Sequence, residues 1–307
     1  MVMATAPGKI ILFGEHAVVY GRPAIAVPVF QVETQVSVEE WRGTQVRIDA
    51  ADIGREYDMA DVPPTDPIAA IIRLTCAALG IEPRGLSVRV RSTIPVARGL
   101  GSGAAVSVAT ARAIARYYGR DLSREQASLL AFEVEKLHHG TPSGVDNTVV
   151  AFAEPIYYVR GKPFERFRTA APFHLAIADT GIPSPTLITV GDVRRLWEAD
   201  KTRYETMFDQ VGEIVREARN RIEGRSPADL GQLMNRNQEL LREMGVSSPE
   251  IERLIEAARR AGANGAKLSG GGRGGNIIAL VEEQARERVA SALTQSGAAS
   301  VIVTRVE

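Results

Sequence analysis

The stretch from Ile94 to Gly119 carries the clearest chemical signal in the chain. Three glycines stand at alternate positions, Gly99, Gly101 and Gly103, and a run of strong helix-forming residues follows them. A glycine loop that leads into a helix directs backbone N–H groups and the positive end of the helix dipole at one point, which suits an anion such as phosphate. A flexible turn before an ordinary helix is the simpler alternative.

Three charged or titratable residues flank a short apolar run near the start of the chain. Residues 10–13 read as a buried strand, with Lys9 before it and Glu15 and His16 after it. Taken singly, each side chain is explained by a surface lysine or by a polar turn. Three such residues around one buried strand indicate a functional site about as strongly as a structural one.

Two carboxylates stand at the ends of apolar segments. Glu135 lies near the end of a helix predicted from Ser123 to His139, where Ser123 and Gln126 match a capping box. Asp146 follows the turn sequence HGTPSG and precedes an apolar run. A solvated helix glutamate and a turn aspartate are the structural alternatives.

Composition excludes several classes of protein. The chain has 307 residues, 45% of them hydrophobic, and no net charge, so nothing suggests a nucleic-acid or membrane-surface partner. The single cysteine, Cys76, falls in an apolar helical stretch and cannot form an intrachain disulfide. The start of the chain has no signal-peptide layout and no segment is long enough to span a bilayer, so we expect a cytoplasmic protein.

The pattern of elements predicts an α+β chain with two domains. The first half is rich in strands, and the second half has helices bracketed by strands. A change in composition near Ala170 places the boundary between residues 171 and 172, giving domains 1–171 and 172–307. We expect helices at 66–80, 104–119, 123–139, 186–222 with one break, 227–244, 249–261 and 282–296, and the clearest strands at 10–13, 32–38, 86–92, 173–179, 266–269, 276–281 and 299–306.

Two glycine patterns match a dinucleotide-binding fingerprint in their residues but not in the elements expected around them. The first runs from Gly99 to Ala104, but Pro95 and three further residues separate it from the preceding strand, which alternates in polarity. The second runs from Gly270 to Gly275 and leads into a strand, not a helix. The chain has no Walker phosphate loop and no His/Cys cluster with metal-ligand spacing. A nucleotide-dependent oxidoreductase is therefore disfavoured.

Three motifs in a fixed order resemble those of the GHMP kinase superfamily, which includes galacto-, homoserine, mevalonate and phosphomevalonate kinases. APGKIILFGEHAVVYG resembles the first motif, PVARGLGSGAAVSVA the second and GAKLSGGGRGGNII the third. GEHAVVYG together with HHGTPSGVDN is most similar to the mevalonate kinases. The resemblance implies a two-domain α+β fold, with an N-terminal domain like domain 2 of ribosomal protein S5, a ferredoxin-like C-terminal domain and an active site in the cleft between them.

The resemblance also implies a reaction and a set of site residues. ATP would phosphorylate the C5 hydroxyl of mevalonate in isoprenoid biosynthesis, with Asp146 as the catalytic carboxylate and Lys9 as the cation that keeps it ionised. We also expect a homodimer. The remaining roles are phosphate binding by Gly99, Leu100, Gly101, Ser102, Gly103 and Ala104, Mg²⁺ binding by Glu135 and Ser102, and substrate binding by Glu15, His16, Thr186 and Gly271.

Two positions depart from the family pattern, and alternatives stay open. The second motif usually has a serine that ligates Mg²⁺ where this chain has Gly103, and the third has Arg273 where glycine is common. Arg273 would contact an anionic ligand or point to solvent. A related kinase acting on phosphomevalonate or another hydroxy acid, or a non-catalytic ligand sensor, would share the same motifs.

Overall fold

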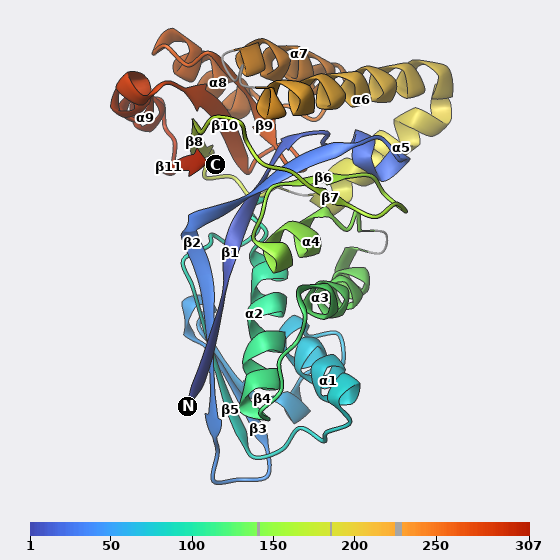
Figure 1. Ribbon diagram of the computed structural model, residues 1–307, viewed down its shortest axis with the longest axis vertical. Coiled ribbons are helices and arrows are strands. Elements are labelled where there is room, and N and C mark those ends of the chain that lie inside the picture. The colour runs from blue at the N-terminus through green and yellow to red at the C-terminus, as the bar shows by residue number, and fades with distance from the viewer. Residues whose placement is uncertain (140–141, 185, 225–228) are drawn as a thin grey trace. The chain divides into compact units, whose positions relative to one another are not determined.

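The computed structural model describes residues 1–139, 142–184, 186–224 and 229–307 (Figure 1). The predicted turn at Gly140 and the predicted helix start at Pro227 lie outside these residues. The chain forms two compact units, each made of three segments. The first unit comprises Met1–Lys9, Pro28–Val96 and Gly101–Ala153, and the second Ile10–Val27, Ala97–Leu100 and Glu154–Glu307. The predicted domain boundary between residues 171 and 172 stays a prediction. The two compact units are divided at other positions of the chain.

A sheet provides the framework of the first unit. Its strands are β1 (Val2–Phe13), β2 (Ala24–Glu40), β3 (Val46–Ala50), β4 (Arg55–Asp58) and β5 (Leu86–Ser92). They run in the order β4-β3-β5-β2, and β1 also pairs with β2. β3 and β5 are parallel, whereas β2 pairs antiparallel with β5. The predicted alternation in β2 is confirmed, since Val32, Val36 and Val38 are buried between more exposed polar residues.

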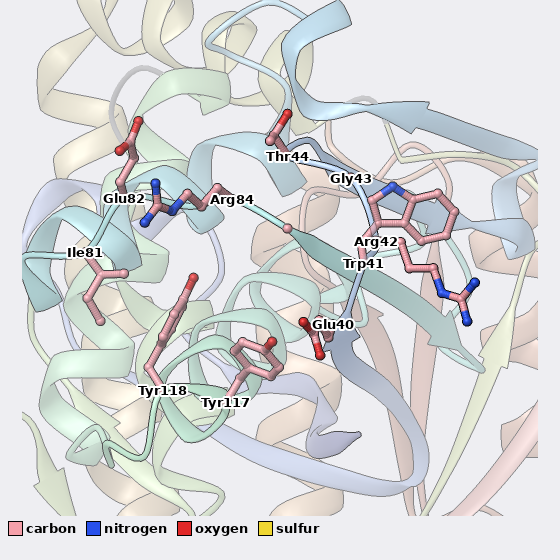
Figure 2. A pocket seen from close by; sticks show the side chains of 11 residues that line it. Glu40, Trp41, Arg42, Gly43, Thr44, Ile81, Glu82, Arg84, Tyr117 and Tyr118 are labelled. Atoms are coloured by element: carbon pink, nitrogen blue, oxygen red, sulfur yellow. The ribbon is translucent and has the colours of Figure 1, made fainter.

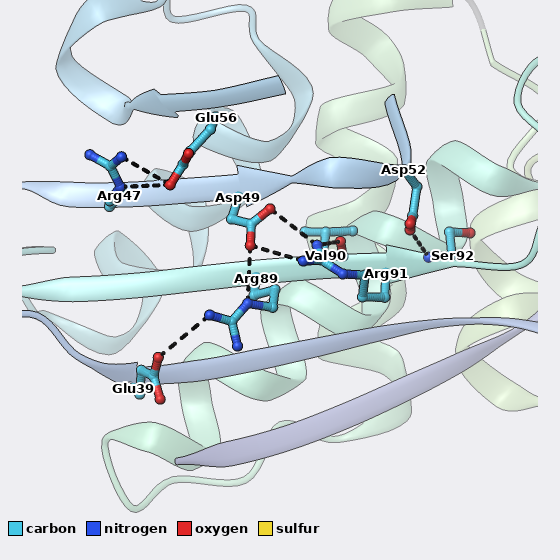
Figure 3. Close-up of polar contacts among 9 residues, drawn as sticks. All are labelled: Glu39, Arg47, Asp49, Asp52, Glu56, Arg89, Val90, Arg91 and Ser92. Atoms are coloured by element: carbon cyan, nitrogen blue, oxygen red, sulfur yellow. Dashed lines mark hydrogen bonds and ion pairs between the residues drawn. The ribbon is translucent and has the colours of Figure 1, made fainter. Parts of the chain in front are cut away.

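An ion-pair cluster reinforces the parallel pair of strands (Figure 3). Asp49 of β3 accepts hydrogen bonds from Arg89 and Arg91 of β5 at 3.0–3.1 Å. The hydrogen bonds from Arg91, and then those from Arg89, hold the pKa of Asp49 below its ordinary value. Arg89 also lies 3.9 Å from Glu39 of β2, so one chain of charges links three strands.

Among the described residues of the first unit, helices that pack on one another are α1 (Pro67–Leu79), α2 (Ser102–Tyr117), α3 (Arg124–His139) and α4 (Val145–Phe152). The caps follow the sequence. Asp66 accepts from the amides of Ile68 and Ala69 at the start of α1, and Ser123 and Gln126 form the predicted capping box of α3. Helix α4 was not predicted, because it is buried on nearly all sides and its sequence therefore shows no helical alternation.

The second unit is built on a four-stranded antiparallel sheet. Its strands are β8 (Phe173–Asp179), β9 (Gly265–Ser269), β10 (Asn276–Val281) and β11 (Ser300–Val306), in the order β11-β8-β10-β9. With helices between β8 and β9 and between β10 and β11, this is the expected ferredoxin-like βαββαβ arrangement. The short strands β6 (Ile156–Tyr158) and β7 (Glu165–Arg166) also belong to this unit, and β6 pairs with residues 24–26 of β2.

The helices described with this sheet are α5 (Thr186–Ala199), α6 (Lys201–Glu223), α7 (Leu230–Glu243), α8 (Pro249–Arg260) and α9 (Arg286–Gln295). Helices α7, α8 and α9 pack on the strands, while α6 packs between α5 and α7. The predicted break in the long helix is confirmed at Asp200, which caps α6 by accepting from the amide of Arg203. Ser248 caps α8 as its sequence predicts.

The approach of α7 to β9 generates a stability prediction. A methyl group at Gly265 would lie 2.0 Å from the carbonyl oxygen of Gly231, a contact that only a backbone shift can relieve. We expect Gly265→Ala to lower the free energy of unfolding by about 2 kcal/mol or more. Gly191→Ala is the control, since Gly191 lies in α5 with open space around it and alanine is the better helix former. Equal urea unfolding midpoints for the two variants would contradict the prediction.

Candidate active site

The glycine loop has the backbone conformation that its sequence predicts. Gly99 and Gly101 have φ angles of 86° and 76°, and Gly101 is the residue that precedes α2. Leu100 and Ala104 are buried and anchor the loop from either side. The first amides of α2, those of Ser102, Gly103 and Ala104, belong to the group that a helix leaves without intrahelical partners. This segment therefore has the backbone of an anion site.

Two of the predicted catalytic residues form an ion pair in the first unit. The Nζ atom of Lys9 lies 2.8 Å from Oδ1 of Asp146, in the first turn of α4. The Lys9 side chain is 3% exposed and the Asp146 side chain 32%. A lysine buried to this degree requires a carboxylate partner, whereas the partly open Asp146 can meet a reactant.

Glu135 of α3 belongs to the same charged group. Burial, and then the nearby Asp146 carboxylate, raise the pKa of Glu135 to about 8, and Lys9 opposes this shift. The three residues come from β1, α3 and α4, and the first unit alone brings them together. One lysine cannot keep both carboxylates ionised, and a cation bound beside them would favour the ionised form of Glu135.

Gly101 makes room for the lysine. A methyl group built on Gly101 would lie 2.7 Å from Cγ of Lys9 and 3.2 Å from its Cε. Glycine is required at position 101 for two reasons, its positive φ angle and the close approach of the lysine side chain. The glycine loop and the predicted catalytic lysine are thus close neighbours.

Three of the four predicted substrate residues meet in the second unit. His16 has φ 61° and ψ −53°, and the amide of Ala17 donates to the carbonyl of Glu15 at 2.7 Å, which is the geometry of a strained classic γ-turn. The His16 imidazole Nε2 lies 3.1 Å from the Gly271 carbonyl oxygen. Because a carbonyl only accepts, Nε2 carries the proton. A methyl group on Gly271 would lie 2.7 Å from Oγ1 of Thr186.

Glu15, the fourth of these residues, is enclosed in the second unit. Its carboxylate Oε1 accepts from Nζ of Lys267 in β9, and both side chains are fully buried. Sequence reasoning missed Lys267. The available signal was a charged residue inside the apolar strand of the third motif, in a chain whose basic residues are mostly arginine.

The two departures from the family pattern have clear local surroundings. Gly103 lies within α2, and a methyl group added to it would meet nothing within 4 Å, so a side chain would fit there. Arg273 has φ 55°, and its guanidinium donates to Asp192 of α5 at 2.5 Å and to the Gly245 carbonyl at 3.1 Å. Asp192 therefore compensates the charge of Arg273 within the second unit, whereas the sequence had left a ligand contact or exposure to solvent as the alternatives.

A pocket of about 630 Å³ lies elsewhere in the first unit (Figure 2). None of the candidate site residues lines it. It is formed by the turn after β2, the segment before β5 and the end of α2: Glu40, Trp41, Arg42, Gly43, Thr44, Ile81, Glu82, Arg84, Gly85, Tyr117 and Tyr118. Within the described ranges, no group of three or more His, Cys, Asp or Glu residues could hold a metal ion by itself.

Comparisons with known proteins agree with the motifs. Residues 67–154 match the family described as GHMP kinases N terminal domain, and residues 204–299 match GHMP kinases C terminal. A mevalonate kinase of Pyrococcus horikoshii is 37% identical over 99% of this chain and 95% of its own length. Searching the described part of the chain reveals no helix both long and apolar enough to cross a membrane.

Solved structures show the same fold. The L. major mevalonate kinase in complex with R-mevalonate has a TM-score of 0.86 and 29% identity, covering 100% of this chain and 96% of that one. The Streptococcus pneumoniae phosphomevalonate kinase in complex with phosphomevalonate and AMPPNP has a TM-score of 0.87, with both chains fully covered. At 16% identity, the second likeness concerns the fold alone.

The buried imidazole predicts how stability depends on pH. The pKa of His16 is lowered from 6.5 to about 4, mainly by burial and to a smaller degree by the charges of Arg273 and Lys267, while the hydrogen bond to Gly271 opposes the shift. Between pH 6.5 and 4 the unfolded chain binds a proton that the folded chain does not. The contribution of the uncharged His16 to the free energy of unfolding is therefore fully present above pH 6.5. It is lost as the pH falls below 6.5, by up to about 1.4 kcal/mol per pH unit.

His16→Asn isolates this contribution, because asparagine tolerates a positive φ and does not titrate. Urea unfolding of both proteins from pH 7.5 to 4.5 measures it. We expect the wild type to lose stability more steeply than the variant below pH 6.5. Parallel curves would show that His16 titrates alike in the folded and unfolded chains.

Proposed function

Because the chain belongs to the GHMP kinase family, we propose that it transfers the γ-phosphoryl group of ATP to the C5 hydroxyl of mevalonate, giving 5-phosphomevalonate and ADP. The substrate follows from relatives named mevalonate kinase that match nearly the whole chain. The structural observation that carries the proposal is the ion pair of Lys9 with Asp146.

The proposed chemistry assigns a proton acceptor to Asp146. As the C5 oxygen attacks the γ-phosphorus, the bond from that phosphorus to ADP breaks and the hydroxyl proton passes to the Asp146 carboxylate. Lys9, 2.8 Å away, holds the carboxylate in place before the transfer and would stabilise the negative charge that develops on the attacking oxygen. Both groups are held by buried elements, so they need no rearrangement during the reaction.

The glycine loop and the second unit would bind the two substrates. The amides at the start of α2 suit the ATP phosphates, and Gly99 and Gly101 let the backbone approach them closely. His16, Gly271 and Thr186 would contact mevalonate, where Nε2–H of the uncharged imidazole donates to the Gly271 carbonyl and Nδ1 is left as a hydrogen-bond acceptor. The homodimer and the cytoplasmic location stay predictions.

The residues present fit a Mg²⁺ ion. Magnesium in phosphoryl-transfer sites is held by one or two carboxylates together with waters and the substrate phosphates. Glu135 is a buried carboxyl beside Asp146 that a cation would keep ionised, and Ser102 begins α2 in the same unit. When bound, the ion would neutralise charge on the β- and γ-phosphates. Gly103 supplies no hydroxyl, so Glu135 would be the main protein ligand.

Substrate assays test the proposal directly. We expect ADP release from ATP with mevalonate, and none with galactose. Phosphomevalonate is the second arm, because a kinase for the phosphorylated acid would share this fold. Turnover with phosphomevalonate and none with mevalonate would overturn the assignment, and binding of mevalonate without ADP release would indicate a sensor.

We expect Asp146→Asn to lower kcat at least about a hundredfold, because the amide keeps the shape of the side chain but cannot take the proton. Asp121→Asn is the matched control, since the Asp121 side chain is 92% exposed. Circular dichroism would establish that both variants are folded. A folded Asp146→Asn protein with near-normal kcat would remove Asp146 from the catalytic role.

Titration of the rate against Mg²⁺ tests the metal ligands. Glu135→Gln should raise the Mg²⁺ concentration needed for half-maximal rate strongly, because the charged ligand is lost. Gly103→Ser should fold normally, as nothing lies within 4 Å of the added Cβ, and should lower that concentration by restoring the hydroxyl. An unchanged Mg²⁺ dependence in Glu135→Gln would rule out the assignment of Glu135.

A further inference from the structure

The second unit contains a buried ion pair that the proposed chemistry does not use. Nζ of Lys267 donates to Glu15 and to the Leu268 carbonyl, the latter at 2.6 Å, and both charged side chains are fully buried. Burial lowers the pKa of Lys267, and the Glu15 carboxylate opposes this shift. Groups so enclosed cannot reach a substrate, so their role must be exerted through what they hold.

The pair holds the turn that carries His16. Glu15 is the residue before His16, and its carbonyl accepts the γ-turn hydrogen bond from Ala17. A classic γ-turn at a residue with a side chain is strained and persists only when its surroundings fix it. Lys267 lies in β9 and fixes the turn by its side chain, while the Gly271 carbonyl in the following loop fixes the imidazole.

Neighbouring contacts restrict the same turn. Gly14 has φ 101°, and a methyl group there would lie 2.5 Å from the Pro23 carbonyl oxygen. At the end of β9, Ser269 Oγ donates to the Ile11 carbonyl at 2.8 Å and accepts from the Ile11 amide at 3.1 Å. These contacts restrain the backbone on either side of the turn, and the ion pair adds a contact to the side chain of residue 15.

We infer that the Glu15–Lys267 ion pair is a positioning device, which holds the strained turn in the conformation that presents the His16 imidazole to the substrate. The inference rests on the proposed function for the identity of that substrate. It assigns Glu15 an indirect role in place of the substrate contact predicted from the sequence. Lys267 becomes a determinant of mevalonate binding although it never touches mevalonate.

Single and double variants separate positioning from stability. Lys267→Met leaves the Glu15 carboxylate buried without its counter-ion and should destabilise the fold. The double variant Glu15→Gln/Lys267→Met removes both charges, so we expect it to recover most of the stability. The turn would still lack its anchor, and the KM for mevalonate should stay about tenfold or more above that of the wild type. The KM for ATP should change less than about twofold.

Lys201→Met is the matched control, because Lys201 is an exposed residue of α6 in the same unit. A double variant with wild-type stability and a wild-type KM for mevalonate would overturn the inference, since the pair would then serve stability alone. The inference would equally be overturned if the double variant were less stable than Lys201→Met but bound mevalonate normally below its unfolding temperature.

Amide hydrogen exchange tests the turn without any substrate. We expect the Ala17 amide to lose protection about tenfold or more in the double variant, while the amide of Ile277 in β10 keeps its protection. This result would stand even if mevalonate were not the substrate, so failure of the proposed function and failure of the inference can be told apart. Unchanged protection at Ala17 would show that the turn does not need the pair.

Discussion

The first unit is arranged around one buried ammonium group. Lys9 lies almost entirely out of water, so its charge must be met by a carboxylate at a fixed place, and Asp146 in the first turn of α4 meets it. The stem of the lysine needs space, which Gly101 leaves by having no side chain. The position of this one charge therefore constrains β1, the glycine loop and the start of α4 together.

The two lysine–carboxylate pairs differ in a way that assigns them different work. In the first unit the carboxylate is 32% exposed, which fits its proposed role as a proton acceptor. In the second unit both partners are fully enclosed, which fits the proposed positioning role. The two proposals thus follow from whether one partner of the pair is open to a ligand.

Local signals in the sequence predicted the elements well, and distant contacts were predicted poorly. Asp66, Ser123 and Ser248 cap helices as their residue types indicate, because a cap acts within three residues. Helix α4 was not predicted, because burial on nearly all sides removes the alternation of polar and apolar residues by which a helix is recognised. The motifs selected Lys9 and Asp146, but the contact of Lys267 with Glu15 joins positions 252 residues apart, and no local pattern encodes it. The sequence also left the surroundings of Arg273 open, because its partner Asp192 lies 81 positions away, in helix α5.

The chain passes from one compact unit to the other after Lys9, Val27, Val96, Leu100 and Ala153. No single cut therefore releases either unit whole, and a fragment that ends anywhere before Ala153 lacks part of the first. During synthesis the first unit cannot close until α4 has emerged, and strand β11 at the far end must join before the second sheet is complete. Neither unit is therefore encoded by one continuous stretch of the gene, and a recombination that exchanged the codons up to Ala153 would replace residues of both.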